Sequence, residues 1–187
     1  MKGRLIVLAL LAVVALAVVA VASGDVFKGT KGNDTIIGTP GPDLIGARAG
    51  DDTVDGEAGN DRIFGGAGND RLLGGGGDDF IRGGPGSDTI DGQAGNDVLR
   101  GRPGDDTING GDGNDVIWVG SGADVENGGP GDDVMHALAA DNQVDRVDCG
   151  PGNDVAYENA SEKDVFVNCE KVITRVVTPQ QAAEDDK

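Results

Sequence analysis

The sequence lacks the residues on which most catalytic sites and soft-metal sites are built. Its 187 residues include one histidine, His136, and two cysteines, Cys149 and Cys169. It has no His-Glu-x-x-His motif and no Gly-x-Ser-x-Gly motif, which are typical of zinc-dependent and serine-dependent hydrolases. A zinc site would lack the nitrogen and sulfur ligands that zinc prefers. We therefore expect that the protein is not an enzyme and has no catalytic or cofactor-binding residues.

Basic and aromatic residues are also scarce. The chain has 15 Lys and Arg against 33 Asp and Glu, a net charge of −18, and only 3% aromatic residues. Such a charge argues against a nucleic-acid partner, because phosphate groups would be repelled. High net charge with little apolar surface to bury is typical of disordered chains. Because the acidic residues recur at a fixed spacing, we expect a chain that is disordered without its ligand and folds with it.

The first 22 residues have the pattern of a signal peptide. Lys2 and Arg4 precede a long uncharged run, which ends with small residues, Ala20 and Ala22, at positions −3 and −1 of a cleavage site. The run is also long enough for a membrane anchor. No aromatic belt or basic stop-transfer cluster follows it, which favours cleavage. We expect a secreted chain that starts near Ser23 and has no stable membrane span after cleavage. If the segment stays uncleaved, the chain would be membrane-anchored.

Twelve aspartates follow one another at intervals of nine residues. A glycine stands two residues before each of them, and an aliphatic residue usually stands two residues after. A fixed period of this length is typical of a solenoid, in which each repeat packs mainly on its neighbours. The aspartates are Asp34, Asp43, Asp52, Asp61, Asp70, Asp79, Asp88, Asp97, Asp106, Asp115, Asp124 and Asp133.

An aspartate at one fixed place in every repeat predicts a column of carboxylates. Like charges stacked at strand spacing repel one another unless a ligand neutralises them. A hard divalent cation is the obvious candidate for that ligand.

Within a repeat, the pattern changes from turn to strand. In residues 65–73, Gly-Gly-Ala-Gly-Asn-Asp-Arg-Leu-Leu, the fourth position is glycine and the sixth is aspartate, as in every repeat. The first six residues favour a turn, because glycine and asparagine tolerate left-handed backbone. The last three favour a short strand with the eighth residue on one face and the seventh and ninth on the other. Such a strand must join a stacked parallel sheet.

The repeat resembles Gly-Gly-x-Gly-x-Asp-x-U-x, with U a large apolar residue, the nonapeptide of the RTX (repeats-in-toxin) calcium-binding family. The resemblance covers residues 29–136. It implies an all-β fold, a right-handed parallel β-roll in which two nonapeptides make one coil. It also implies calcium ions between successive turns on each edge, held by the aspartates and by turn carbonyls.

The resemblance predicts two columns of metal ligands, one on each edge of the roll. Six turns on an edge leave five gaps, so we expect about ten Ca²⁺ in all. One column would contain Asp34, Asp52, Asp70, Asp88, Asp106 and Asp124, and the other Asp43, Asp61, Asp79, Asp97, Asp115 and Asp133.

Some repeats depart from the pattern. Ala47 and Val119 replace the first glycine, and Glu126 occupies the apolar position of the eleventh repeat. We expect that this repeat binds calcium weakly or is distorted. The sites at the two ends of the columns lack a neighbour on one side.

The repeats are flanked by less regular segments. We interpret residues 23–28 as a lead-in, 137–176 as divergent repeats that form a C-terminal cap, and 177–187 as an acidic tail. In an exported chain a lone pair of cysteines most simply forms a disulfide. A disulfide between Cys149 and Cys169 would cross-link the cap. The alternative, a soft-metal site, would lack further ligands.

Two functional hypotheses remain. The first is an exported calcium-binding protein without chemistry of its own. The second is a Ca²⁺-dependent adhesion or recognition module that binds a cell-surface or glycan partner. An outer face rich in arginine and aromatic residues favours the second, although the same face could pack on the cap or the lead-in, or simply be exposed. Its residues are Arg62, Phe64, Phe80, Arg82, Arg100 and Trp118.

Overall fold

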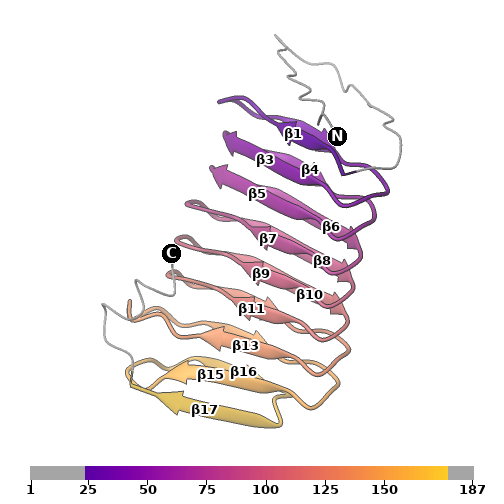
Figure 1. The fold of residues 1–187 in the computed structure, drawn as a ribbon. Helices are drawn as coiled ribbons and strands as arrows, with labels where there is room; N and C mark the ends of the chain where they lie inside the picture. Colours follow the sequence, from indigo (N-terminus) through magenta and orange to yellow (C-terminus); the bar gives the residue numbers. More distant parts are fainter. Residues whose placement is uncertain (1–23, 177–187) are drawn as a thin grey trace.

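The computed structural model describes residues 24–176, and these residues form a stack of about eight coils (Figure 1). The predicted signal peptide, 1–22, and the predicted acidic tail, 177–187, lie outside the described residues. Every pair of neighbouring strands is parallel. The predicted all-β parallel solenoid is therefore confirmed. Residues 24–176 include no helix of the length and apolarity that a membrane crossing requires.

The strands form two parallel sheets on opposite sides of the coil, because successive strands in the sequence alternate between the sheets. The nine-stranded sheet contains β1 (Val26–Lys28), β3 (Leu44–Ala49), β5 (Arg62–Ala67), β7 (Phe80–Arg82), β9 (Val98–Arg100), β11 (Val116–Trp118), β13 (Val134–Ala137), β15 (Val155–Asn159) and β17 (Lys171–Arg175). The eight-stranded sheet contains β2 (Thr35–Ile37), β4 (Thr53–Asp55), β6 (Arg71–Gly76), β8 (Thr89–Ala94), β10 (Thr107–Asp112), β12 (Val125–Asn127), β14 (Arg146–Asp148) and β16 (Val165–Val167).

The register between strands follows the repeat. Strands two repeats apart pair residue for residue, as Leu72 with Ile90. Beyond the twelfth repeat the partners lie further apart in the sequence, as Met135 with Ala156, because three residues have been inserted. The segment predicted as a cap thus continues both sheets through β14, β15, β16 and β17. The predicted lead-in supplies β1, which pairs with β3.

The core is a single file of side chains between the two sheets. The eighth residue of nearly every repeat is buried, while its neighbours on either side in the strand point outward. Because each repeat buries about one aliphatic side chain, the apolar core is thin for the length of chain that it must order. These core residues are Ile36, Ile45, Val54, Ile63, Leu72, Ile81, Ile90, Leu99, Ile108, Ile117 and Met135.

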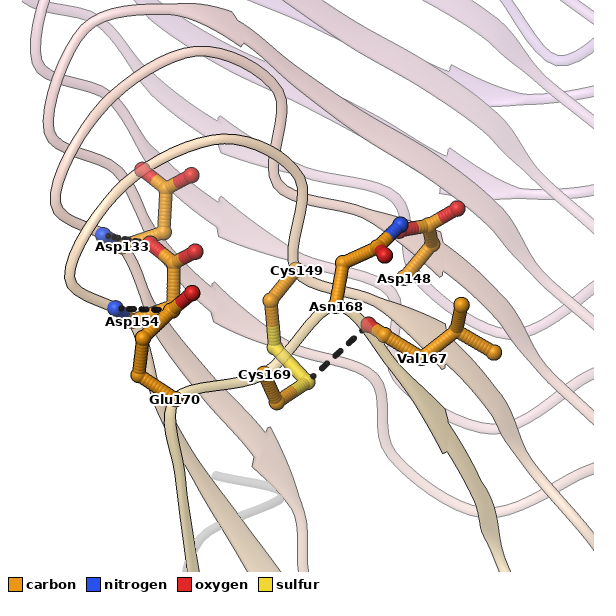
Figure 2. The surroundings of a disulfide bond; sticks show 8 residues. All are labelled: Asp133, Asp148, Cys149, Asp154, Val167, Asn168, Cys169 and Glu170. Carbon is orange, nitrogen blue, oxygen red and sulfur yellow. Dashed lines mark hydrogen bonds between the residues drawn. A yellow bond between two sulfur atoms is a disulfide. The ribbon is translucent and has the colours of Figure 1, made fainter.

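The predicted disulfide is confirmed. Cys149 follows β14 and Cys169 follows β16, the last two strands of the eight-stranded sheet, and their Cα atoms are 5.1 Å apart. Figure 2 shows the bond beside the final turns. It ties the last coil, which has no further coil to cover it, to the coil before it.

Glu126 replaces an aliphatic residue in this core without distorting its strand. It pairs in register between Ile108 and Val147, and only 1% of its surface is exposed. Neither carboxylate oxygen has a hydrogen-bond partner among the described residues. Burial raises the pKa of Glu126 well above its usual value, and the nearby Asp145 and Asp124 raise it further. The distortion expected for this repeat is thus absent from β12.

We predict that Glu126→Leu raises the free energy of unfolding in calcium by about 1–3 kcal/mol, because it removes a buried polar group that has no partner. Chemical denaturation measures the change. As the matched control, Ile108→Glu places the same carboxylate one coil earlier and should lower stability. A loss of stability or of calcium affinity in Glu126→Leu would instead mean that Glu126 is itself a ligand.

Candidate metal centre

The repeat aspartates form two continuous hydrogen-bonded columns, one at each edge of the roll. In each column, the backbone amide of one aspartate donates to Oδ1 of the next, over 2.7–2.9 Å in the twelve repeats. In the repeats these partners are 18 residues apart, as Asp70 and Asp88. The sequence predicted the two columns but not this amide-to-carboxylate link. The steps of the first column run from Asp34 through Asp124, and those of the second from Asp43 through Asp133.

The columns extend beyond the twelve predicted residues. Asp145 and Asp164 continue the first column after Asp124. Asp154 and Glu170 continue the second after Asp133, as Figure 2 shows. Asp145 and Asp154 stand nine residues apart, which was a usable indication of their role. Glu170 carried no such indication, because its longer side chain reaches the column from an irregular segment.

The first carboxylate of each column is satisfied by the protein itself. The amide of Thr30 donates to Asp34 Oδ2 over 2.5 Å, and the amide of Thr39 donates to Asp43 Oδ2 over 2.6 Å. Both threonine hydroxyls also bond the same carboxylate. Since Thr30 and Thr39 stand at the second position of the first two repeats, they close the columns at the N-terminal end of the described residues.

In most column aspartates after Asp43, the second carboxylate oxygen has no such partner. Oδ2 of these aspartates is buried and accepts no hydrogen bond from any described residue. A buried carboxylate oxygen without a donor is costly, so it indicates a site for a cation. The aspartates in this condition include Asp52, Asp61, Asp70, Asp79, Asp88, Asp97, Asp106, Asp115, Asp133, Asp145, Asp154 and Asp164.

Glycine allows the turns to approach these oxygens closely. A Cβ atom added to Gly65, the first residue of its repeat, would lie 2.3 Å from Asp70 Oδ2. A Cβ atom on Gly86, whose φ is +134°, would lie 2.1 Å from the carbonyl oxygen of Gly68 in the previous coil. Carboxylate and carbonyl oxygens therefore lie around the same turns, with only hydrogen atoms on the glycines. This all-oxygen donor set fits Ca²⁺, which takes six to eight such ligands.

The columns hold their negative charge at a cost. Burial, with a smaller contribution from neighbouring carboxylates in the column, raises the pKa of Asp88 and Asp97 to about 7 and that of Asp106 to about 9. The donated amides act in the opposite direction but do not offset burial. Other members behave alike, with pKa values raised to about 6 for Asp52, Asp79 and Asp164, about 7 for Asp61 and Asp133, and about 8 for Asp145.

Within residues 24–176, no group of three or more histidine, cysteine, aspartate or glutamate side chains lies close enough together to hold a metal ion. The columns explain this, because each coil contributes one carboxylate per edge. A cation between two coils would contact two carboxylates and complete its coordination with turn carbonyls. The donor set therefore differs from that of an EF-hand loop, which gathers several carboxylates on one segment.

The six residues of the predicted partner face lie together on the outer side of the nine-stranded sheet. Arg62 and Phe64 lie on β5, and Phe80, Arg82 and Arg100 lie on the next two strands. Trp118 follows on β11. His136, Tyr157 and Arg175 extend this face and were not predicted. They lie on β13, β15 and β17, at the C-terminal end of the sheet.

Fold and site together define a parallel β-solenoid whose turns repeat one acidic, glycine-rich site. The model of a known family, the RTX calcium-binding nonapeptide repeat in four copies, matches residues 28–63, 37–72, 55–90, 64–99, 91–126, 110–144 and 127–157. These matches cover well over half of the chain, which therefore belongs to the RTX calcium-binding repeat family. A search of curated proteins found no match.

We predict that Asp88→Asn raises the calcium concentration needed for half-saturation by roughly threefold to tenfold, because it removes one column charge between two coils. Calcium titration by calorimetry measures this. Asp91→Asn is the matched control: Asp91 lies on the outer side of β8 and bonds Asn109. An equal effect of both substitutions would mean that overall charge, and not the column, governs binding.

We predict that acid stabilises the metal-free roll and opposes calcium. Among the column aspartates, the pKa is raised from 3.8 to about 6 for Asp52 and to about 9 for Asp106. A raised pKa adds stability below the unfolded pKa, and this stability is lost as the pH rises through the folded pKa. In chelator, β structure should therefore increase from about pH 8 to about pH 5, while the half-saturating calcium concentration should rise over the same range. Circular dichroism in chelator that is independent of pH would contradict this.

Proposed function

We propose that the protein is an exported calcium-binding protein whose repeats fold into the β-roll as they bind about ten Ca²⁺. It has no catalytic activity in this proposal. The observation that carries it is the series of buried Oδ2 atoms without donors, repeated along both edges beside glycine turns. A cation at each step removes the repulsion within the column and contributes the contacts that the carboxylates lack.

Calcium fits this role better than magnesium. The available ligands are carboxylate oxygens from two coils and carbonyl oxygens of the turns, at positions set by the stacking of the coils. Ca²⁺ accepts six to eight oxygens in flexible geometry, whereas Mg²⁺ requires a near-regular octahedron and keeps several waters. About ten Ca²⁺ would also bring roughly twenty positive charges to a chain whose net charge is −18.

Export is part of the proposal and is supported by the first 22 residues and by the disulfide. Lys2, Arg4 and the uncharged run that follows them match a signal peptide. The Cys149–Cys169 bond suits an oxidising compartment. Calcium is plentiful outside cells, so folding would be completed after export. Recovery from the culture medium of a chain that begins near Ser23 tests this part.

A second candidate function is calcium-dependent adhesion or recognition. It is favoured by the arginine and aromatic side chains on the outer side of the nine-stranded sheet. Arg100 lies over the rings of both Phe80 and Trp118. This face would exist only in the folded roll, so calcium would control binding to a cell-surface or glycan partner.

We predict a cooperative gain of β structure when Ca²⁺ is added to the mature chain in chelator, followed by far-ultraviolet circular dichroism. Mg²⁺ at the same concentration should give little change, because its geometry does not suit the turns. Binding of about ten ions per chain over the same transition would support the proposed stoichiometry. A spectrum that does not respond to Ca²⁺ would contradict the proposal.

A further inference from the structure

The outer side of the nine-stranded sheet is cationic and aromatic in a chain that is strongly acidic. The first and third residues of its nine strands include no aspartate or glutamate. The same positions include Lys28, Arg62, Arg82, Arg100 and Lys171. We call this surface the cationic face. Its composition contrasts with the net charge of −18 for the whole chain.

Aromatic and guanidinium groups alternate along the middle of the cationic face. Arg62 lies 5.0 Å from the centre of the Phe80 ring, and Phe64 lies 5.9 Å from it. Arg100 lies 5.8 Å from the Phe80 ring and 4.6 Å from the Trp118 ring. The cation–π contacts hold the long arginine side chains against the sheet. These side chains therefore lose less conformational entropy when a ligand binds.

Three flat rings continue the series towards the C-terminal end of the roll. Trp118 stacks on His136 with ring centres 4.8 Å apart and an angle of 7°. His136 stacks on Tyr157 at 5.0 Å and 12°, and Arg175 lies over Tyr157 at 4.4 Å. These half-buried rings belong to strands that are neighbours in the sheet. They line one path along the roll axis.

The opposite side of the roll carries a different surface. On the eight-stranded sheet, Asn109 bonds Asp91 and Asn127 bonds Asn109. Asp55 and Asp148 occupy the equivalent outward positions on β4 and β14. Since two repeats make one coil, each sheet draws its outer residues from alternate repeats, which allows the two faces to differ in charge.

We propose that the cationic face binds a linear anionic polysaccharide laid along the roll axis. The arginine forks suit carboxylate or sulfate groups, and the edges of the stacked rings offer apolar contact to the pyranose rings between those groups. Neighbouring strands are about 4.8 Å apart, close to the advance per sugar of an extended chain. Two copies of the protein would not pair symmetrically through this face, because both would present cations.

The proposal rests on calcium-driven folding, because only the assembled sheet brings Arg62, Arg100 and Trp118 together. The test uses hyaluronan oligosaccharides with the calcium-saturated mature chain at physiological salt. Trp118 is the only tryptophan, so its fluorescence reports on the face directly. We expect saturable binding that changes this fluorescence and disappears in chelator.

Paired substitutions localise the binding. Arg62→Gln with Arg100→Gln removes two cations from the cationic face and should weaken binding by about tenfold. Arg71→Gln with Arg146→Gln removes the same charge from exposed positions on the eight-stranded sheet and should change affinity by less than about twofold. Circular dichroism in calcium checks that both variants fold.

Four outcomes would overturn the inference: no binding by a chain that circular dichroism shows to be folded, equal weakening by the two pairs, equal affinity for polyglutamate, or equal affinity for the uncharged methyl ester of hyaluronan. A chain that folds with calcium but binds no polysaccharide would leave the proposed calcium function intact. A chain that calcium does not fold would contradict that function separately.

Discussion

The structure depends on a carboxylate that is hydrogen bonded on one side only. In each column the amide of one aspartate donates to Oδ1 of the next, as from Asp70 to Asp88, and so ties neighbouring coils together. The same contact buries Oδ2 without a donor. Stacking the coils therefore assembles the fold and accumulates like charge in one step. A divalent cation at each step turns this unfavourable arrangement into the main cross-link between coils.

The other features of the roll follow from this constraint. Glycine is required where a side chain would strike the column carboxylate, as at Gly65, or a carbonyl group of the previous coil, as at Gly86. A core of one aliphatic file is too thin to order such glycine-rich turns by itself. The threonines at the start of each column and the disulfide at the far end limit the cost of the two terminal coils. The outer faces are free of these demands, so they can differ in composition and serve binding.

Much of this architecture could be predicted from the sequence, because a strict period fixes register. The inward position of Ile63 and Ile81 follows from spacing, the disulfide from the lone cysteine pair, and the division into two columns from the resemblance to the RTX repeat. The pattern could not show that Thr30 would replace a cation at Asp34, since that depends on a local hydrogen bond. Nor could it place Glu170 in a column, because an insertion breaks the period and a longer side chain covers the difference.

Hydrogen exchange of the turn amides tests the central claim most directly, since the amides of Asp52 to Asp133 donate to the column carboxylates in the assembled roll. Peptides spanning this range would be followed in calcium, in magnesium and in chelator. The account predicts strong protection in calcium and almost none in chelator or magnesium. Equal protection of these amides with and without calcium would contradict it, because the columns would then be stable without a cation.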